Sequence, residues 1–326
     1  MARAEIQRAV ELLLAGQLVA IPTETVYGLG ADARNPAALA RIFSAKGRPA
    51  DHPLIVHLPG DDHLERWARD IPDLAWELAE QFWPGPLTLI LKRRPEVLDA
   101  VTGGQDTVGL RVPGHPLALE LLREFAAAGG SGGIAAPSAN RFGRISPTTA
   151  QHVRDDLGDA VPLILDGGPC QVGIESTIVD LSREAPVILR PGMISAETLA
   201  LVLGSSPLAD PAAGAAPRVS GSLAAHYAPR TALAMVTGDA LAGELERRRT
   251  AGTTVAVLSR YRPAGDVKHW IPSGLDPRVY GHDLYAHLRQ LDASGADLIL
   301  VEAVSAQGDW AAVADRLRRA AAGAGL

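Results

Sequence analysis

Apolar and polar positions follow two alternating periods along this chain, and together they predict a mixed α/β fold. Short apolar runs are typical of buried strands, and stretches with apolar residues three and four apart are typical of amphipathic helices. Up to about residue 204 the predicted strands are 18–22, 54–58, 87–92, 108–112, 133–136, 162–165, 177–181 and 186–190. The predicted helices are 3–15, 36–45, 61–69, 73–82, 116–128, 148–155 and 195–203. The irregular alternation favours a twisted, mixed open sheet over a regular doubly wound one.

The pattern changes after residue 204. Residues 204–222 are rich in Gly, Ser, Pro and Ala and offer little that could form a core, as is typical of a linker. Past Pro229 the alternation resumes, with strands near 232–236, 254–258 and 297–301 and helices near 239–249, 280–293 and 308–321. This predicts a small, Rossmann-like α/β domain. We therefore expect a larger domain over 1–204, a linker or lid over 205–230 and a C-terminal domain over 231–326.

Composition narrows the class of protein. A chain of 326 residues is long enough for two domains, and 47% hydrophobic with 21% charged residues describes an ordinary globular protein. The net charge of −6 argues against a nucleic-acid-binding surface over the whole chain, although Lys46, Arg48, Arg111 and Arg190 could form a local basic site. The single cysteine, Cys170, excludes an internal disulfide and a Cys/His zinc cluster.

The chain carries no sign of targeting or of membrane insertion. Its first residues lack the apolar core of a signal peptide. No uninterrupted apolar run reaches the roughly 18 residues that a membrane span needs. We therefore expect a cytoplasmic protein without a membrane span.

The segment 19–58 carries the densest chemical signal. An apolar strand runs into Pro22-Thr23-Glu24-Thr25-Val26-Tyr27-Gly28, a helix follows, and Lys46-Gly47-Arg48-Pro49 leads to a second strand that ends at His57. This unit can place Thr25, Lys46, Arg48 and His57 around one anionic ligand. A lysine point charge and an arginine fork suit a phosphate. The alternatives are a solvated helix end that complements the helix dipole, and an ordinary core or surface histidine.

A dinucleotide-binding alternative rests on Gly28-x-Gly30-x-x-Ala33, with Asp51 about 20 residues further on. That fingerprint needs its glycines at a helix N-terminus, where backbone amides face a pyrophosphate. Here the helix start signal is Asn35-Pro36, beyond the motif, so we disfavour this interpretation.

Four further motifs follow in order: Ala136-Pro137-Ser138-Ala139-Asn140, Gly173-Ile174-Glu175-Ser176-Thr177, Leu189-Arg190-Pro191-Gly192 and His226-Tyr227-Ala228-Pro229. With segment 19–58 they resemble the YrdC family, and the last motif marks its two-domain branch. The resemblance implies a YrdC-like catalytic domain and an L-threonylcarbamoyl-AMP synthase, a nucleotidyltransferase. Such an enzyme converts L-threonine, bicarbonate or CO2, and ATP into threonylcarbamoyl-adenylate and pyrophosphate, for threonylcarbamoyladenosine modification of tRNA.

The resemblance also implies roles for individual residues. It assigns ATP binding to Lys46, Arg48, His52, Thr107, Ser138, Asn140, Ser146, Arg190 and Tyr227, with Lys46 and Arg48 also catalytic. It assigns L-threonine binding to Thr25, His57, Arg111, Ala136 and Ser176. His52 departs from the family, which usually has asparagine there. From the residues themselves, strand alternation places Thr107, Gly109 and Arg111 on one face, where an arginine can hold a carboxylate through two hydrogen bonds.

We expect such an enzyme to work by positioning and charge neutralisation, with Mg2+ arriving with ATP. Its metal ligands stay open. Tyr227 should close over the nucleotide as part of a lid. The expected partners are ATP, L-threonine, bicarbonate and the machinery that transfers the threonylcarbamoyl group to tRNA, and direct tRNA binding stays open.

Two alternatives come from other classes of protein. One is an RNA-binding module with a basic cleft, which the acidic chain and its lack of interleaved aromatic and basic residues disfavour. The other is a carbamoyltransferase of the hydrogenase-maturation type, whose zinc modules a single cysteine cannot supply.

Overall fold

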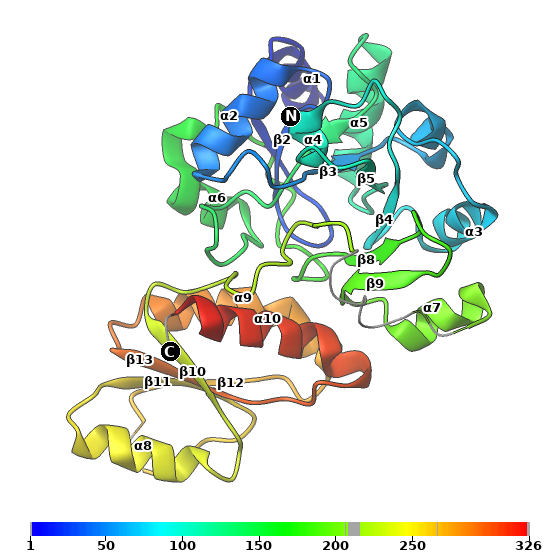
Figure 1. Cartoon of the computed structure of the whole chain (residues 1–326). Coiled ribbons are helices and arrows are strands. Elements are labelled where there is room, and N and C mark those ends of the chain that lie inside the picture. Colours follow the sequence, from blue (N-terminus) through cyan, green and yellow to red (C-terminus); the bar gives the residue numbers. More distant parts are fainter. Residues whose placement is uncertain (1, 206, 208–215, 266, 325–326) are drawn as a thin grey trace. The chain divides into compact units, whose positions relative to one another are not determined.

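A computed structural model describes residues 2–205, 207, 216–265 and 267–324. The chain divides into two compact units (Figure 1). The first comprises Met1–Phe142, Pro147–Gln171 and Glu175–Ser222, and the second comprises Gly143–Ser146, Val172–Ile174 and Leu223–Leu326. Gly143–Ser146 and Val172–Ile174 lie within the range predicted for the first domain, 1–204, but belong to the second unit.

A mixed sheet organises the first unit, as the pattern predicted. Its described strands are β1 (Val19–Ile21), β2 (Gly28–Asp32), β3 (Ile55–His57), β4 (Leu87–Lys92), β5 (Thr107–Arg111), β6 (Ile134–Ala135), β7 (Leu163–Ile164), β8 (Thr177–Asp180) and β9 (Val187–Arg190). They lie in the order β7-β1-β2-β6-β3-β5-β4-β8-β9. The sheet contains parallel pairs such as β3–β5 and β4–β8 and antiparallel pairs such as β4–β5.

Helices pack around this sheet. They are α1 (Ala2–Leu14), α2 (Pro36–Lys46), α3 (Asp73–Phe82), α4 (Asp99–Thr102), α5 (Pro116–Ala127), α6 (Ala150–Leu157) and α7 (Ala196–Leu203), with 3-10 turns at η1 (Asp61–Arg66) and η2 (Gly158–Ala160). Helix α2 begins and ends as predicted. The Asn35 side chain accepts hydrogen bonds from the first free amides, Pro36 follows it, and Gly47 ends the helix in the left-handed conformation (φ 62°). The helix predicted over 61–69 is instead the 3-10 turn η1.

Strand β2 was not predicted, because its glycines resemble a bend in the sequence. A Cβ at Gly30 would lie 3.0 Å from Cγ2 of Ile134 on the neighbouring strand β6, so the missing side chain permits the close approach. Gly28 and Gly30 thus pair in a sheet and do not open a helix. This excludes the dinucleotide-binding interpretation, which needs them at a helix N-terminus.

One face of the central strands packs into the hydrophobic core, and the opposite face carries predicted site residues. On β5, Val108 and Leu110 join the main hydrophobic core with Val56 and Leu89 from the adjacent strands. The opposite face carries Thr107, Gly109 and Arg111, as the alternation predicted. Gly109 pairs with Ile55 on β3 and with Ile90 on β4. Because residues in register share a face, those isoleucines flank Gly109 on this second face, which we call the site face.

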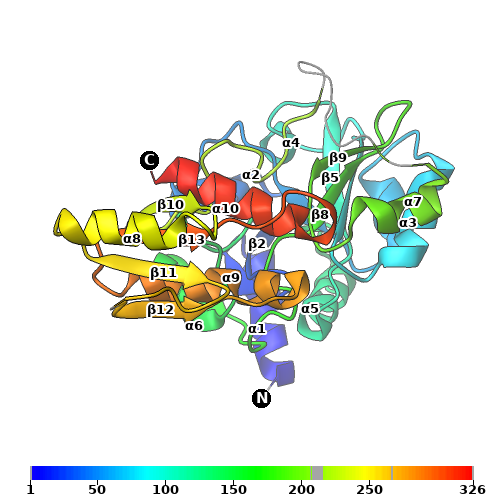
Figure 2. The same cartoon turned by 90° about the horizontal axis from the view of Figure 1, so that it is seen from below.

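The second unit is a smaller parallel α/β domain, as predicted. Its strands β10 (Ala232–Val236), β11 (Val255–Ser259), β12 (His269–Pro272) and β13 (Leu298–Glu302) lie in the order β10-β13-β11-β12. Helices α9 (Pro277–Asp292) and α10 (Ala311–Gly323, after the 3-10 turn η3 at Gly308–Trp310) cover one face, and α8 (Leu241–Thr250) covers the other (Figures 1 and 2). Strand β12 was not predicted, because its sequence His-Trp-Ile-Pro is short and ends in proline, as an edge strand tolerates.

The predicted linker divides between the units. Residues 216–222 belong to the first unit and 223–230 to the second. Residues 206 and 208–215 of that prediction lie outside the described part of the chain. Val219 is buried against Ile90 and Ile178, so this part of the linker contributes to a small apolar cluster. Among the described helices, none combines the length and the apolar character needed to cross a membrane.

Candidate active site

Arg111 is the centre of a buried polar cluster on the site face. Its NH2 donates to Glu24 Oε1 at 2.5 Å, its NH1 to Thr25 Oγ1 at 2.9 Å and its Nε to the Gly85 carbonyl at 3.1 Å. The other oxygen of Glu24 accepts the Gly114 amide at 2.8 Å. A desolvated guanidinium needs such partners, and they fix its orientation. Each terminal nitrogen carries a second N–H that these bonds do not use, so the fork can still meet a ligand carboxylate.

A hydroxyl turn between β1 and β2 presents Glu24 and Thr25. The Thr23 hydroxyl donates to the Val26 carbonyl at 2.6 Å and accepts the amides of Thr25 and Val26. Such side-chain bonds to nearby backbone stabilise a turn. The Thr23 and Thr25 hydroxyls also lie 2.9 Å apart. The local sequence therefore determines the turn, and the turn aims its acid and its hydroxyl at Arg111.

His57 is paired in register with Arg111 across β3 and β5. Burial, followed by the positive charge of Arg111, lowers the pKa of His57 to about 3. Its ring is therefore neutral near pH 7. Its buried Nδ1 has no hydrogen-bond partner among the described residues. Neighbouring Ala136 donates its amide to the Ile55 carbonyl at 3.0 Å. Contact of His57 and Ala136 with L-threonine stays a prediction.

Ser176 and Arg190 form a second buried group on the same sheet. Arg190 donates from NH2 to the Ser176 hydroxyl and from Nε to its carbonyl, both at 3.0 Å. The Ser176 hydroxyl also bonds with that of Thr88 at 2.7 Å. Arg190 NH1 donates to the Ser220 carbonyl of the linker at 2.8 Å. A residue predicted for threonine and one predicted for ATP are thus direct neighbours.

Lys46, at the end of α2, is almost fully buried. Its Nζ donates to the carbonyls of Ser138 at 2.5 Å and Asn140 at 2.6 Å, which ties the helix end to the predicted Ser-x-Asn segment. Burial, and then the nearby charge of Arg48, hold the pKa of Lys46 well below its usual range. The alternative of a solvated cation is therefore wrong for Lys46. Its contact with a phosphate stays a prediction.

Arg48 lies close to His52 and to the apolar edge of the site. Its NH2 donates to the Pro53 carbonyl at 2.9 Å, and its guanidinium lies 5.6 Å from the Phe142 ring centre. The His52 ring meets the same Phe142 edge to face, with centroids 5.2 Å apart. Burial, and then Arg48, lower the pKa of His52. A neutral histidine can donate one hydrogen bond, as an asparagine can.

Ser146 and Tyr227 belong to the second unit. Tyr227 is buried and has a left-handed backbone (φ 60°), which is uncommon for a residue with a side chain. Its ring lies 4.2 Å from that of His226 and 5.7 Å from that of Tyr285. The next residue, Ala228, donates its amide to Gly143 at 2.9 Å. The motif is therefore a packed element of this unit, and nucleotide contacts of Ser146 and Tyr227 stay predictions.

Two polar residues of the site were missed in the sequence. Glu24 could have been suspected, because a carboxylate between two threonines in an otherwise apolar segment is unusual. Thr88 carries no such signal, since threonine is ordinary in a strand. Both are buried, and both hold a predicted site residue in place.

Known proteins are similar to this chain over nearly its whole length. Residues 11–192 match the Sua5/YciO/YrdC family, described as "Telomere recombination", and residues 194–322 match "Threonylcarbamoyl-AMP synthase, C-terminal domain". The chain is 39% identical over 325 residues to the threonylcarbamoyl-AMP synthase of Pyrococcus abyssi, covering 97% of this chain and 94% of that protein. It is 39% identical over 330 residues to the Bacillus subtilis enzyme of the same name, covering 98% and 93%.

Solved structures agree with the sequence relatives. The structure of P. abyssi Sua5 complexed with L-threonine superposes with a TM-score of 0.89 at 38% identity, covering 98% of this chain and 94% of that one. A second structure, of a doubly substituted variant of P. abyssi Sua5, also has a TM-score of 0.89, at 37% identity, and covers 98% and 93%. The similarity therefore includes both units and is not confined to the larger one.

Proposed function

Because the chain belongs to the Sua5/YciO/YrdC family of threonylcarbamoyl-AMP synthases, we propose that it makes threonylcarbamoyl-AMP from L-threonine, bicarbonate or CO2, and ATP. Pyrophosphate is the second product, so the enzyme is a nucleotidyltransferase. The product serves threonylcarbamoyladenosine modification of tRNA through a separate transferring machinery. We place the reaction in the cytoplasm.

The observation that carries the proposal is the pairing of Arg111 with Glu24 and Thr25. An amino acid such as L-threonine offers one carboxylate, and a rigid guanidinium with free N–H positions is a suitable partner. The neutral His57 beside it adds no second charge and suits the hydroxyl or the amine. Ser176, held by Arg190, supplies a further hydroxyl.

The reaction joins two anionic substrates, a carbamate and the triphosphate of ATP. The threonine amine adds to CO2 and loses a proton to give a carbamate. A carbamate oxygen then attacks the α-phosphorus of ATP, the bond to the β-phosphate bridge breaks, and pyrophosphate leaves with those electrons. Arg48 and Arg190 are the cations we assign to this region, and their backbone bonds hold them in place before the substrates arrive. Fixed charges of this kind stabilise developing negative charge without reorganisation.

Mg2+ enters, in this proposal, with ATP. Among the described residues, no group of three or more His, Cys, Asp or Glu side chains could hold a metal ion. Mg2+ commonly keeps several waters and binds substrate phosphates with few protein ligands. Bound with ATP, Mg2+ would help to neutralise the charge of the phosphates.

Product analysis tests the proposed function. The full chain is incubated with MgATP, L-threonine and bicarbonate, and each is omitted in turn. We expect pyrophosphate and a threonylcarbamoyl-adenylate only when all are present. Release of ADP and orthophosphate would exclude adenylation, and pyrophosphate release without threonine would exclude threonine as the acceptor.

A further inference from the structure

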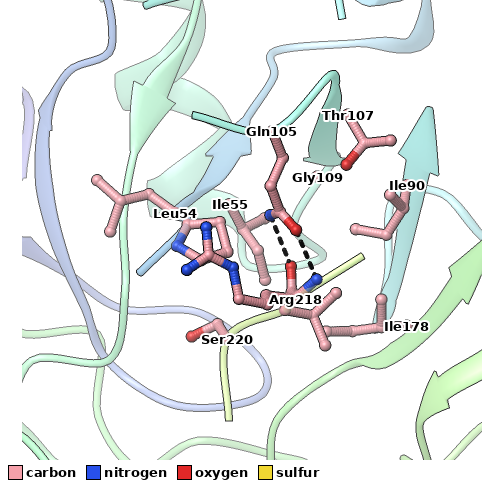
Figure 3. Close-up of a pocket in the computed structure, with 11 residues that line it drawn as sticks. Leu54, Ile55, Ile90, Gln105, Thr107, Gly109, Ile178, Arg218 and Ser220 are labelled. Atoms are coloured by element: carbon pink, nitrogen blue, oxygen red, sulfur yellow. Dashed lines mark hydrogen bonds between the residues drawn. The ribbon is translucent and has the colours of Figure 1, made fainter. Parts of the chain in front are cut away.

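The Gln105 carboxamide lies at the edge of the site face and holds the backbone of the linker. Its Nε2 donates to the Arg218 carbonyl at 3.0 Å, and its Oε1 accepts the Arg218 amide at 2.6 Å. Figure 3 shows the two bonds side by side. Nε2 also donates to the Thr102 carbonyl at 3.1 Å, a contact within its own loop. The Thr102 carbonyl can only accept, so this bond fixes the orientation of the carboxamide. Oε1 is therefore the acceptor and Nε2 the donor on the side that faces Arg218.

The linker peptide lines a small pocket together with Gln105 and Thr107. Ile55, Ile90 and Ile178 contribute apolar side chains to its lining, and Gly109 also lines it without a side chain (Figure 3). Val219 fills part of this space and is packed on Ile90 and Ile178. An apolar pocket with one polar edge is suited to an aromatic ring that carries hydrogen-bonding groups.

Two arginines donate to backbone carbonyls of residues that line this pocket. Arg48 donates to the carbonyl of Pro53. Arg190 donates to the carbonyl of Ser220. Cations beside an apolar pocket suit a nucleotide, whose base is uncharged and whose phosphates are anionic.

We propose that Gln105 is the base-reading residue of the nucleotide site, and that a purine with a 6-amino group takes the place of the Arg218 peptide on its carboxamide. This inference rests on the proposed function for the presence of ATP. An amide paired with adenine accepts from the 6-amino group and donates to a ring nitrogen, the same donor and acceptor order that the Arg218 peptide satisfies. A 6-keto purine would set its oxygen against Oε1 of Gln105 and lose that bond.

Nucleotide discrimination in the full chain tests the assignment. The values of kcat/KM for ATP and for ITP, which carries a keto group in place of the 6-amino group, are measured by pyrophosphate release. A two-bond amide contact corresponds to a preference of roughly 5- to 150-fold for ATP. In Gln105→Met, which keeps the length and removes the hydrogen bonds, the ratio should fall towards one. Gln105→Glu keeps the acceptor and should retain part of the preference.

Arg218→Ala is the matched control. The Arg218 side chain donates to the Gly103 carbonyl at 2.8 Å and pairs with Asp51 at 3.4 Å, so the variant loosens the linker and leaves Gln105 intact. It should change the KM for both nucleotides in parallel and keep the ATP/ITP ratio. If Gln105→Met behaves like Arg218→Ala, or if the wild type does not discriminate, Gln105 only anchors the linker and the assignment is wrong.

Calorimetry separates this inference from the proposed function. Binding of ATP and ITP is measured without threonine, so it does not depend on turnover. Tighter binding of ATP that is lost in Gln105→Met would support base reading even if the wild type formed no threonylcarbamoyl-AMP. Equal binding of both nucleotides by the wild type would overturn it even if the synthase activity were present.

Discussion

Replacing Glu24 by glutamine tests whether the buried pair with Arg111 organises the site. The two side chains are only 7% and 5% exposed, and the pair is 2.5 Å long. Glutamine keeps one acceptor for Arg111, removes the negative charge and presents an N–H to the Gly114 amide, which now donates to Glu24 at 2.8 Å. Breaking a buried ion pair by removing one partner costs about 3–5 kcal/mol, since the remaining charge stays desolvated.

The matched control is Glu11→Gln on α1. Arg8 and Glu11 form an ion pair at 3.0 Å, but their side chains are 63% and 66% exposed. Water and salt screen such a pair, so its loss should cost less than about 1 kcal/mol. The comparison therefore separates burial from the mere presence of an ion pair.

Urea unfolding followed by tryptophan fluorescence measures both free energies. The chain has five tryptophans, and Trp270 and Trp310 belong to the second unit. Both variants are therefore made in a Trp270→Phe/Trp310→Phe background, where the remaining tryptophans report only on the first unit. This avoids treating a chain of two units as one two-state system. If Glu24→Gln lowers the free energy of unfolding no more than Glu11→Gln does, the buried pair does not stabilise the site.

Three further variants test other residues of the site. Lys46→Ala should slow pyrophosphate release about 10- to 150-fold, because the predicted charge-assisted contact of Lys46 with a phosphate, worth roughly 1.5–3 kcal/mol, is lost. A near-normal rate would show that the Lys46 side chain matters little for turnover. Arg111→Lys should weaken L-threonine far more than ATP in separate calorimetric titrations, since a point charge replaces the fork; an equal loss for both would place Arg111 in the wrong pocket. The folded pKa of His57, about 3, lies below its unfolded value, so the unfolded chain binds the extra proton between about pH 3 and 6.5 and stability should fall as the pH drops through that window. His57→Asn should reduce that slope by up to about 1.4 kcal/mol per pH unit in urea unfolding, and an unchanged slope would mean that His57 is not the titrating group.

Sequence patterns located most of the elements of the first unit but not all of them. Helix α2 was predicted from its cap and its terminal glycine, because those signals act within a few residues. Strand β2 was missed, since a glycine-rich strand forms only when its neighbours approach closely enough to use the missing side chains. The linker was interpreted as having no core, yet one valine in it meets two isoleucines from distant strands.

In the candidate site, too, the sequence predicted some residues but not the residues that they bond to. Of the residues predicted from segment 19–58, Thr25 bonds to Arg111 and His57 pairs with it in register, and alternation along β5 was enough to group Thr107 with Arg111. Their partners could not be predicted. Lys46 bonds to carbonyls 92 and 94 positions away, and Arg111 bonds to a carboxylate 87 positions away. Thr88 and Gln105 consequently became visible only once the structure showed what they hold.

The sequence alone determined the residue types available for chemistry, the two-unit organisation, the helix boundaries with strong caps and the face on which each strand residue lies. These follow from spacing along the chain, since helix and strand geometry repeats every few residues. The tertiary structure decided the strand order and the burial and lowered pKa values of Lys46 and His57. It also decided that residues 218–220 of the linker pack on the site face. These depend on which distant segments meet, and that is set by the packing of the whole unit and not by any local pattern.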